Sequence, residues 1–117
     1  MNTFFKDLKI VELANVLAGP AVGMFFAELG ADVIKIENKL TNGDVTRSWK
    51  LAGEDSNTPI SAYYASVNWG KKSLEVDLND SKEKQKIYDL IKGADIVIAN
   101  YKPGDVFFLM SHNPFLA

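Results

Sequence analysis

The sequence contains no cysteine and a single histidine, His112. Without cysteine the protein can form neither a disulfide framework nor a thiolate metal site. The lone histidine has no carboxylate close by at the spacing of a metal site or a catalytic triad, so it indicates neither kind of site. We therefore expect no metal. The lack of cysteine also fits a reducing compartment, and we expect a cytoplasmic protein.

The sequence also lacks a long hydrophobic run and an excess of charge of one sign. Its most apolar stretch, residues 13–29, includes Asn15 and Glu28 and is shorter than the run of about 20 apolar residues that a membrane span needs. Lys6 and Asp7 interrupt any secretory leader. The 13 basic and 15 acidic residues give a net charge of −2. We expect neither a membrane nor nucleic acid as partner.

What the sequence does contain is a domain-sized chain of 117 residues, 47% of them hydrophobic. Runs rich in β-branched residues at 8–13 and 31–37 predict two strands. Between them, residues 21–29 predict a buried helix, with Pro20 at its first position and Gly30 as a left-handed cap. Such a strand–helix–strand unit is almost always parallel and right-handed.

The second half of the chain continues the alternation. Residues 60–67 predict a short helix, and residues 73–78 predict a strand that belongs to the sheet or to a hairpin. A helix follows, with Asp80 and Glu83 at the spacing of a capping box, and residues 95–99 predict a buried strand.

These elements predict an α/β fold, with a Rossmann-like, partly parallel sheet and flanking helices. We expect residues 1–105 to be the incomplete N-terminal part of a larger domain, because the sheet has too few strands to close. Residues 106–117 fit no element and are interpreted as a divergent or disordered tail.

Ligands of open parallel sheets bind beyond the carboxyl ends of the strands. Loops 14–19, 38–44, 78–79 and 100–104 are therefore the candidate binding loops. The first leads into a helix N-terminus, which favours phosphate, although Pro20 has no N–H group to donate. A tight turn without any ligand is an equally good interpretation of this loop.

Other motifs are less specific. Glu37 ends a strand, where a dinucleotide-binding domain holds ribose, but the glycine spacing does not match and an ordinary strand-end acid is favoured. Lys71 and Lys72 follow Gly70 as in a phosphate loop, yet a strand follows, so we interpret them as a solvated edge. Residues 43–49 predict a structured loop with Arg47 as an ion-pair candidate.

Five segments together resemble one known family in their order and spacing: residues 16–20, 29–37, 43–47, 68–74 and 100–104. The chain is similar to family III CoA transferases, a group that includes formyl-CoA and carnitine CoA transferases and alpha-methylacyl-CoA racemases. The resemblance spans roughly residues 7–105. It implies a Rossmann-like large domain, coenzyme A as a substrate with an acyl-CoA and a carboxylic acid as partners, and, in the complete protein, a homodimer of interlocked rings.

By position, the resemblance implies coenzyme A contacts from residues of four strand-end loops: Leu17, Ala18, Asn38, Val76, Asp77, Leu78, Asn79, Asn100, Tyr101 and Lys102. The chain departs from the family at Asn38, where a basic residue often lies, and at Phe108, where some members have arginine. The catalytic aspartate of the family would lie beyond residue 117. In the family that carboxylate attacks the acyl-CoA thioester, giving a mixed anhydride and then an aspartyl thioester.

The resemblance thus predicts a fragment of an acyl-CoA transferase that holds part of the coenzyme A site and is inactive alone. One alternative is a stand-alone Rossmann-type nucleotide-binding module, NAD-dependent or non-catalytic. Another is a non-functional truncated product, because an incomplete sheet exposes an edge and an apolar face.

Overall fold

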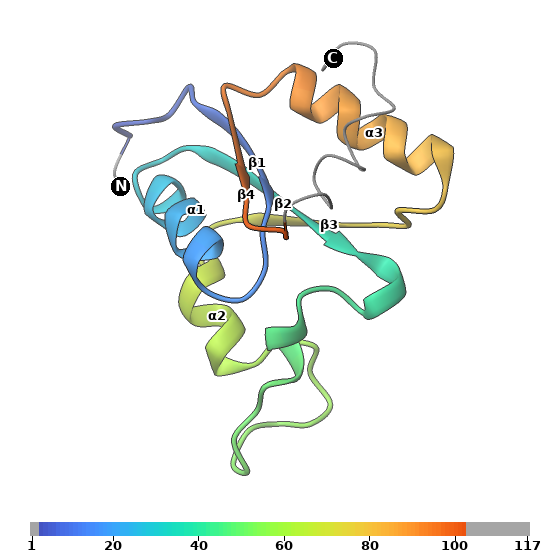
Figure 1. Cartoon of the computed structure of the whole chain (residues 1–117). Coiled ribbons are helices and arrows are strands. Elements are labelled where there is room, and N and C mark those ends of the chain that lie inside the picture. The colour runs from blue at the N-terminus through green and yellow to red at the C-terminus, as the bar shows by residue number, and fades with distance from the viewer. Residues whose placement is uncertain (1–2, 103–117) are drawn as a thin grey trace.

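The computed structural model of the chain describes residues 3–102. Within that range, four parallel strands form one sheet in the order β3-β2-β1-β4 (Figure 1). Their bounds are β1 Lys9–Leu13, β2 Asp32–Asn38, β3 Lys72–Val76 and β4 Ile96–Ala99. The chain builds outward from β1 to β3 and then crosses back to β4. The strand order therefore reverses between β1 and β4, as in doubly wound folds.

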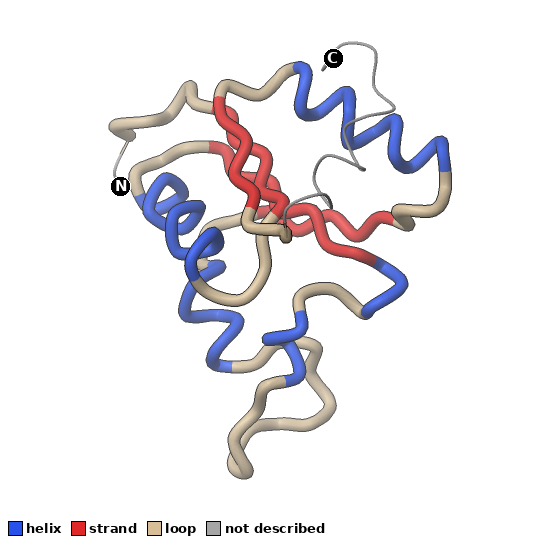
Figure 2. The backbone as a smooth tube through the Cα atoms, in the orientation of Figure 1, coloured by secondary structure: helices blue, strands red, loops and turns tan. Residues whose placement is uncertain are grey.

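Helices cover both faces of this sheet (Figure 2). Helices α1 (Ala18–Glu28) and α2 (Ala62–Asn68) contact each other on one face, and α3 (Ser81–Lys92) lies on the other. Two short 3-10 helices, η1 (Lys39–Thr41) and η2 (Val45–Ser48), follow β2. The loop between η2 and α2 projects from the body at the bottom of both figures.

The alternation of side chains along the strands builds a core on each face. On the α3 face, Val11 and Leu13 of β1 belong to the same buried cluster as Ile87 of α3. On the opposite face, Ile10 and Val33 pack with Phe26 of α1. Because successive strand residues point to opposite faces, Glu12 and Lys35 necessarily face the α1 side, between the sheet and that helix.

The predicted elements are all present, with shifted boundaries. Helix α1 begins at Ala18, so Pro20 is its third residue and not its first. Gly30 has a φ of +97°, which confirms the left-handed cap. Strand β3 pairs in parallel with β2, with Val76 opposite Asn38, so the hairpin alternative is wrong and the loop after β3 belongs to the same edge of the sheet.

The predicted capping box is half right. The Asp80 carboxylate accepts hydrogen bonds from the N–H groups of Lys82 (2.8 Å) and Glu83 (3.2 Å). The Glu83 carboxylate, however, accepts from the N–H of Asp77 and not from that of Asp80. In a complete capping box the Glu83 side chain would bind the N–H of the N-cap residue, Asp80. Here it reaches past Asp80 to Asp77, and so it stabilises the turn that follows β3.

This cap leads to a first testable prediction. Replacing Asp80 with alanine is expected to lower the free energy of unfolding by about 1 kcal/mol, because two N–H groups of the first turn lose their acceptor. Asp80→Asn keeps an acceptor oxygen and is expected to lose less than half as much. Urea denaturation of the three proteins measures this. Equal losses for the two variants would contradict the capping role.

Three features of the sequence fall outside the described residues: Phe108, His112 and the predicted tail at 106–117. The boundary at residue 105 accordingly stays a prediction. None of the helices within residues 3–102 has the length and apolar composition of a membrane span.

Candidate functional site

The carboxyl ends of the four described strands lie along one edge of the sheet. Asn38, at the end of β2, pairs with Val76 at the end of β3, and Leu13 of β1 pairs with Ala99 of β4. Each loop predicted to bind a ligand therefore leaves the sheet at this edge. We call the edge, with its loops at 14–19, 38–44, 77–79 and 100–102, the strand-end rim.

A hollow of about 480 Å³ opens on the rim between β1 and β4, where the strand order reverses. Residues 15–18 line one wall and residues 100–102 line the other. We call it the switch-point hollow. It brings together five of the residues selected from the sequence: Leu17, Ala18, Asn100, Tyr101 and Lys102.

The amide of Asn100 ties the two walls of the hollow together. Its Oδ1 accepts from the N–H of Asn15 (2.9 Å) and its Nδ2 donates to the carbonyl of Asn15 (2.7 Å). The side chain of Asn100 thus satisfies both backbone groups of one residue in the opposite loop. Tyr101 is partly buried against the α3-side core, and burial, followed by the charges of Asp44 and Glu12, raises the pKa of its hydroxyl.

The start of helix α1 forms the floor of the same hollow. Leu17 is the N-cap residue and no side chain caps the helix, so Ala18 and the buried Gly19 carry the uncapped N–H groups of the first turn, because Pro20 has none. Gly19 allows the helix to begin this close to the sheet, because a Cβ there would lie 2.4 Å from the Cβ of Ala14. The positive end of the α1 dipole therefore lies at the hollow.

The other selected residues lie along the rim but do not line this hollow. The Asn38 side chain accepts from the N–H of Leu40 (3.0 Å) and caps η1. Asp77 accepts from the N–H of Asn79 (2.9 Å), and Val76 is buried under α3 while Leu78 packs against the same core. Asn79 is exposed. The side chains of Asn38 and Asp77 hence stabilise their own turns.

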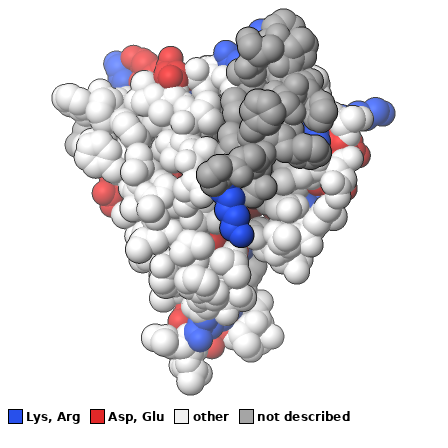
Figure 3. Space-filling view, viewed as in Figure 1, with Lys and Arg blue, Asp and Glu red and all other residues white. Residues whose placement is uncertain are grey.

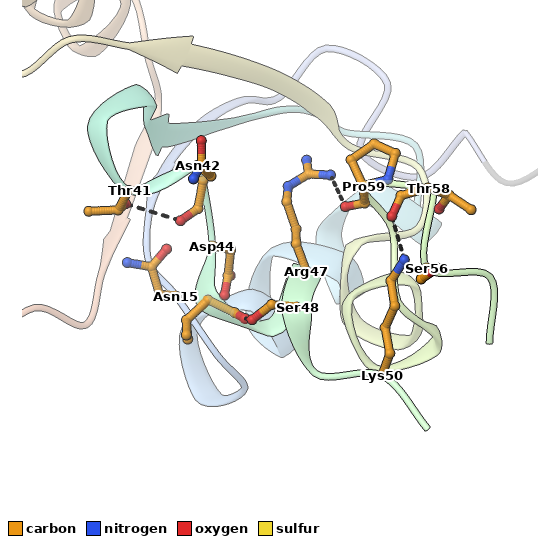
Figure 4. Close-up of a pocket in the computed structure, with 12 residues that line it drawn as sticks. Asn15, Thr41, Asn42, Asp44, Arg47, Ser48, Lys50, Ser56, Thr58 and Pro59 are labelled. Atoms are coloured by element: carbon orange, nitrogen blue, oxygen red, sulfur yellow. Dashed lines mark hydrogen bonds between the residues drawn. The ribbon is translucent and has the colours of Figure 1, made fainter. Parts of the chain in front are cut away.

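A second, larger hollow of about 940 Å³ adjoins the first (Figure 4). It is lined by one residue of the β1–α1 loop, by residues that follow β2 and by the loop before α2: Asn15, Thr41, Asn42, Gly43, Asp44, Val45, Arg47, Ser48, Lys50, Ser56, Thr58 and Pro59. Arg47 donates to the carbonyl of Pro59 (3.1 Å) and Lys50 to that of Thr58, so both cations link the walls. The sequence indicates this hollow only by its loop composition. The loop before α2, which forms one of its walls, has no periodic pattern of apolar residues that would predict its position.

Beneath the rim lies a cluster of four charged side chains, Glu12, Lys35, Asp44 and Lys71, which we call the buried charge cluster. The Lys35 Nζ lies 3.0 Å from Glu12 Oε2 and 3.0 Å from Asp44 Oδ2, and all three side chains are fully buried. Lys71 Nζ lies 2.7 Å from Glu12 Oε1. Glu12 Oε1 has no hydrogen bond of good geometry within residues 3–102, so its negative charge is compensated by the nearby ammonium group alone. The two carboxylates and the two ammonium groups of the cluster give a net charge of zero.

The prediction of a solvated lysine edge is therefore wrong for Lys71. Its side chain is 2% exposed, and it also donates to the carbonyl of Pro20 (2.8 Å). Burial lowers the pKa of its ammonium, and the charge of Glu12 opposes that shift. Lys72, with a side chain 71% exposed, does lie on the surface. The two lysines differ because Lys71 reaches the buried Glu12 and the carbonyl of Pro20, whereas Lys72 pairs with the partly exposed Asp32.

Glu37 is held by a second group of polar side chains. Arg47 binds it in a bidentate way, Nε to Oε1 (2.8 Å) and Nη2 to Oε2 (2.6 Å), which confirms Arg47 as an ion-pair residue. Tyr64 (3.0 Å) and Ser73 donate to the same carboxylate. Burial would raise the pKa of Glu37, but the hydrogen bonds from Arg47, Ser73 and the Asp44 N–H lower it to about 2. Glu37 is thus an ionised carboxylate with a structural role, because protein side chains already occupy both of its oxygens.

On the face viewed in Figure 3, the coloured basic and acidic side chains are scattered and form no broad patch of one sign. Among residues 3–102, no three His, Cys, Asp or Glu side chains gather at a possible metal site.

The strand order and the helices on both faces of the sheet define a doubly wound α/β domain, and the switch-point hollow lies where ligands bind in folds of this class. Residues 5–109 match the model of CoA-transferase family III, and the chain belongs to this family.

Known proteins agree with this assignment. The chain is 45% identical to an acyl-CoA transferase of Fusarium pseudograminearum over 83% of its own length, and 36% identical to a succinyl-CoA:mesaconate CoA-transferase of Haloarcula hispanica over 94%. It covers 22% and 29% of those proteins. The crystal structure of a CAIB/BAIF family protein from Brucella suis is similar over 93% of this chain and 29% of that one, with 38% identity and a TM-score of 0.79. The chain therefore spans less than a third of these relatives.

Proposed function

We propose that this chain supplies the coenzyme A-binding rim of an acyl-CoA transferase that moves CoA between carboxylic acids. The observation that carries the proposal is the switch-point hollow, in which Leu17 and Ala18 face Asn100, Tyr101 and Lys102 at the N-terminus of α1. Membership of CoA-transferase family III supports it.

The hollow offers each part of a nucleotide a suitable contact. The N–H group of the exposed Ala18 and the helix dipole attract phosphate, and the exposed ammonium of Lys102 adds a point charge. The apolar surfaces of Leu17 and Tyr101 suit an adenine ring. Asn38 and residues 76–79 extend the contact along the rim. Asn15 lines both hollows, so a ligand as long as coenzyme A can pass from one into the other.

The nucleophilic carboxylate is proposed to come from elsewhere in the transferase. Asp44, at the rim, is 1% exposed and bound to Lys35, Thr46 and the backbone of Val16. Burial raises its pKa, but the hydrogen bonds from Thr46 and Lys35 outweigh burial and keep the pKa low. A carboxylate engaged by so many donors is a poor nucleophile.

We propose that residues 1–117 do not transfer CoA by themselves. We also propose that the complete protein is a cytoplasmic homodimer that acts on an acyl-CoA and a carboxylic acid.

Calorimetric titration of the purified chain with coenzyme A and with NAD tests the proposal. We expect coenzyme A to bind and NAD to bind more weakly, because Glu37, the acid that would hold ribose, is occupied by Arg47.

Replacing Lys102 with alanine is expected to weaken CoA binding about fivefold to tenfold and to reduce its salt dependence. Lys9→Ala, at the opposite end of β1, is the matched control and should not change the affinity. Tighter binding of NAD, or equal effects of the two lysine variants, would refute the assignment.

A further inference from the structure

Val16, in the loop between β1 and α1, has an unusual backbone conformation. Its φ is +72°, in the left-handed region, where the only other described residue that is not glycine is Asn42 at +57°. Asparagine tolerates this region, whereas a β-branched residue such as valine is strained there. Strain of this kind persists only where surrounding contacts enforce it. The contacts that enforce it at Val16 are therefore informative.

Two members of the buried charge cluster, Asp44 and Lys35, supply those contacts. The N–H of Val16 points at the Asp44 carboxylate, 3.2 Å from Oδ2 and 3.4 Å from Oδ1. Two residues earlier, the carbonyl of Ala14 accepts a hydrogen bond from Lys35 Nζ (2.6 Å). The Lys35–Asp44 ion pair thus holds the loop on both sides of Asn15.

Asp44 is itself held firmly. Its Oδ1 accepts from the N–H (3.0 Å) and the hydroxyl (2.9 Å) of Thr46, and Lys35 Nζ lies 3.0 Å from Oδ2. It leads directly into η2, whose N-cap it forms. A carboxylate fixed by several donors can impose a conformation on a neighbouring chain, because it cannot turn to follow a relaxed loop.

We propose that Asp44 is a positioning residue for the coenzyme A site. By binding the N–H of Val16 it holds that residue left-handed, and the next two residues, Leu17 and Ala18, are then aimed into the switch-point hollow. Although Asp44 borders the second hollow, its side chain is fully buried, so in this scheme it acts through Val16 and not by binding the ligand. The inference rests on the proposed function for the identity of the ligand, but the effect of Asp44 on the loop can be measured without any ligand.

The first measurement compares CoA affinity between two variants of the same cluster. Asp44→Asn is nearly isosteric but removes the charge, and it is expected to weaken CoA binding about tenfold, the change that follows from losing one charge-assisted contact. Glu12→Gln removes a carboxylate that is equally buried. Within residues 3–102 its polar contacts go to Lys35 and Lys71 and not to the loop, so CoA affinity is expected to stay within about twofold.

A rescue experiment separates positioning from general stability. Glycine adopts the left-handed region without strain, so adding Val16→Gly to Asp44→Asn is expected to restore much of the lost CoA affinity, measured against Val16→Gly alone. A merely structural role predicts no rescue, since glycine adds no contact. If Asp44→Asn does not fold, Asp44→Glu keeps the charge beside Lys35 but displaces the carboxylate from Val16, and the same loss and rescue are expected.

Hydrogen exchange of the backbone amides without ligand completes the test. Asp44→Asn is expected to speed exchange selectively at residues 15–18, and Glu12→Gln is not. If the unmodified chain does not bind CoA but exchange responds as expected, the proposed function fails while Asp44 still holds the loop. If the chain binds CoA and Asp44→Asn or Asp44→Glu binds it equally well, or if Val16→Gly gives no rescue, the positioning role is overturned.

Discussion

Replacing Lys35 with methionine is expected to lower the free energy of unfolding by about 3–5 kcal/mol, because two buried carboxylates then lose their shared cation. Glu12 and Asp44 each lie 3.0 Å from its ammonium group. Against a typical total of about 5–15 kcal/mol, a loss of this size removes much of the stability of the domain. Denaturant unfolding followed by circular dichroism measures it.

Lys72 provides the matched control for this experiment. It is also a strand lysine with an acidic partner, Asp32 at 2.9 Å, but its side chain is 71% exposed. Lys72→Met is therefore expected to cost less than about 1 kcal/mol. A loss at Lys35 no larger than that at Lys72 would show that the buried charge cluster does not hold the sheet and its rim together.

Acid is expected to destabilise the protein through Glu37. Its pKa in the folded protein is about 2, below the ordinary value of 4.5. A depressed carboxyl pKa contributes stability that is fully present above the unfolded value, near pH 4.5, and is lost as the pH falls towards 2. The contribution of this residue is about 3 kcal/mol.

Unfolding free energies measured between about pH 6 and pH 2 test this expectation. In Glu37→Gln the share of the acid-induced loss of stability that comes from this carboxylate should disappear. The free energy of unfolding should therefore fall less steeply with decreasing pH below pH 4.5. Glu28→Gln, which removes a surface carboxylate from the end of α1, is the control and should keep the slope of the unmodified protein. An unchanged slope in Glu37→Gln would mean that the bidentate Arg47 contact does not hold the charge as described.

Much of the fold could be predicted from local patterns. The β-branched runs, the glycine at Gly30 and the apolar segment between them define β1, α1 and β2 to within a few residues. The geometry of parallel sheets then places the strand-end loops on one rim, as the register of β1, β2, β3 and β4 confirms. These inferences succeed because each depends on neighbours in the sequence or on a general rule of topology.

The buried charges could not be predicted in the same way. The local pattern favours a solvated Lys71 although this residue pairs with Glu12, and nothing near Asp44 connects it with Val16. These contacts join residues that are 28 to 59 positions apart, so no pattern in the local sequence indicates them. One signal was available. Buried parallel strands are normally almost wholly apolar, and opposite charges at Glu12 and Lys35, which are register partners, mark an ion pair.

The same buried charges connect the stability of the fold with the proposed function. Lys35 and Asp44 hold Ala14 and Val16, and Asn100 holds Asn15, so three successive residues of the β1–α1 loop are fixed by side chains from elsewhere in the fold. A preorganised loop loses less entropy when a ligand binds. The rim can thus be shaped for coenzyme A before the ligand arrives.

The most direct test of the central claim is to map coenzyme A onto the isotope-labelled chain by following its backbone amide resonances during titration. We predict that the largest shifts fall on Leu17 and Ala18 and on residues 100–102, the two walls of the switch-point hollow. Shifts confined to the opposite edge of the sheet, around Lys9, Asp32 and Asp95, or the absence of any shift at saturating coenzyme A, would contradict that claim.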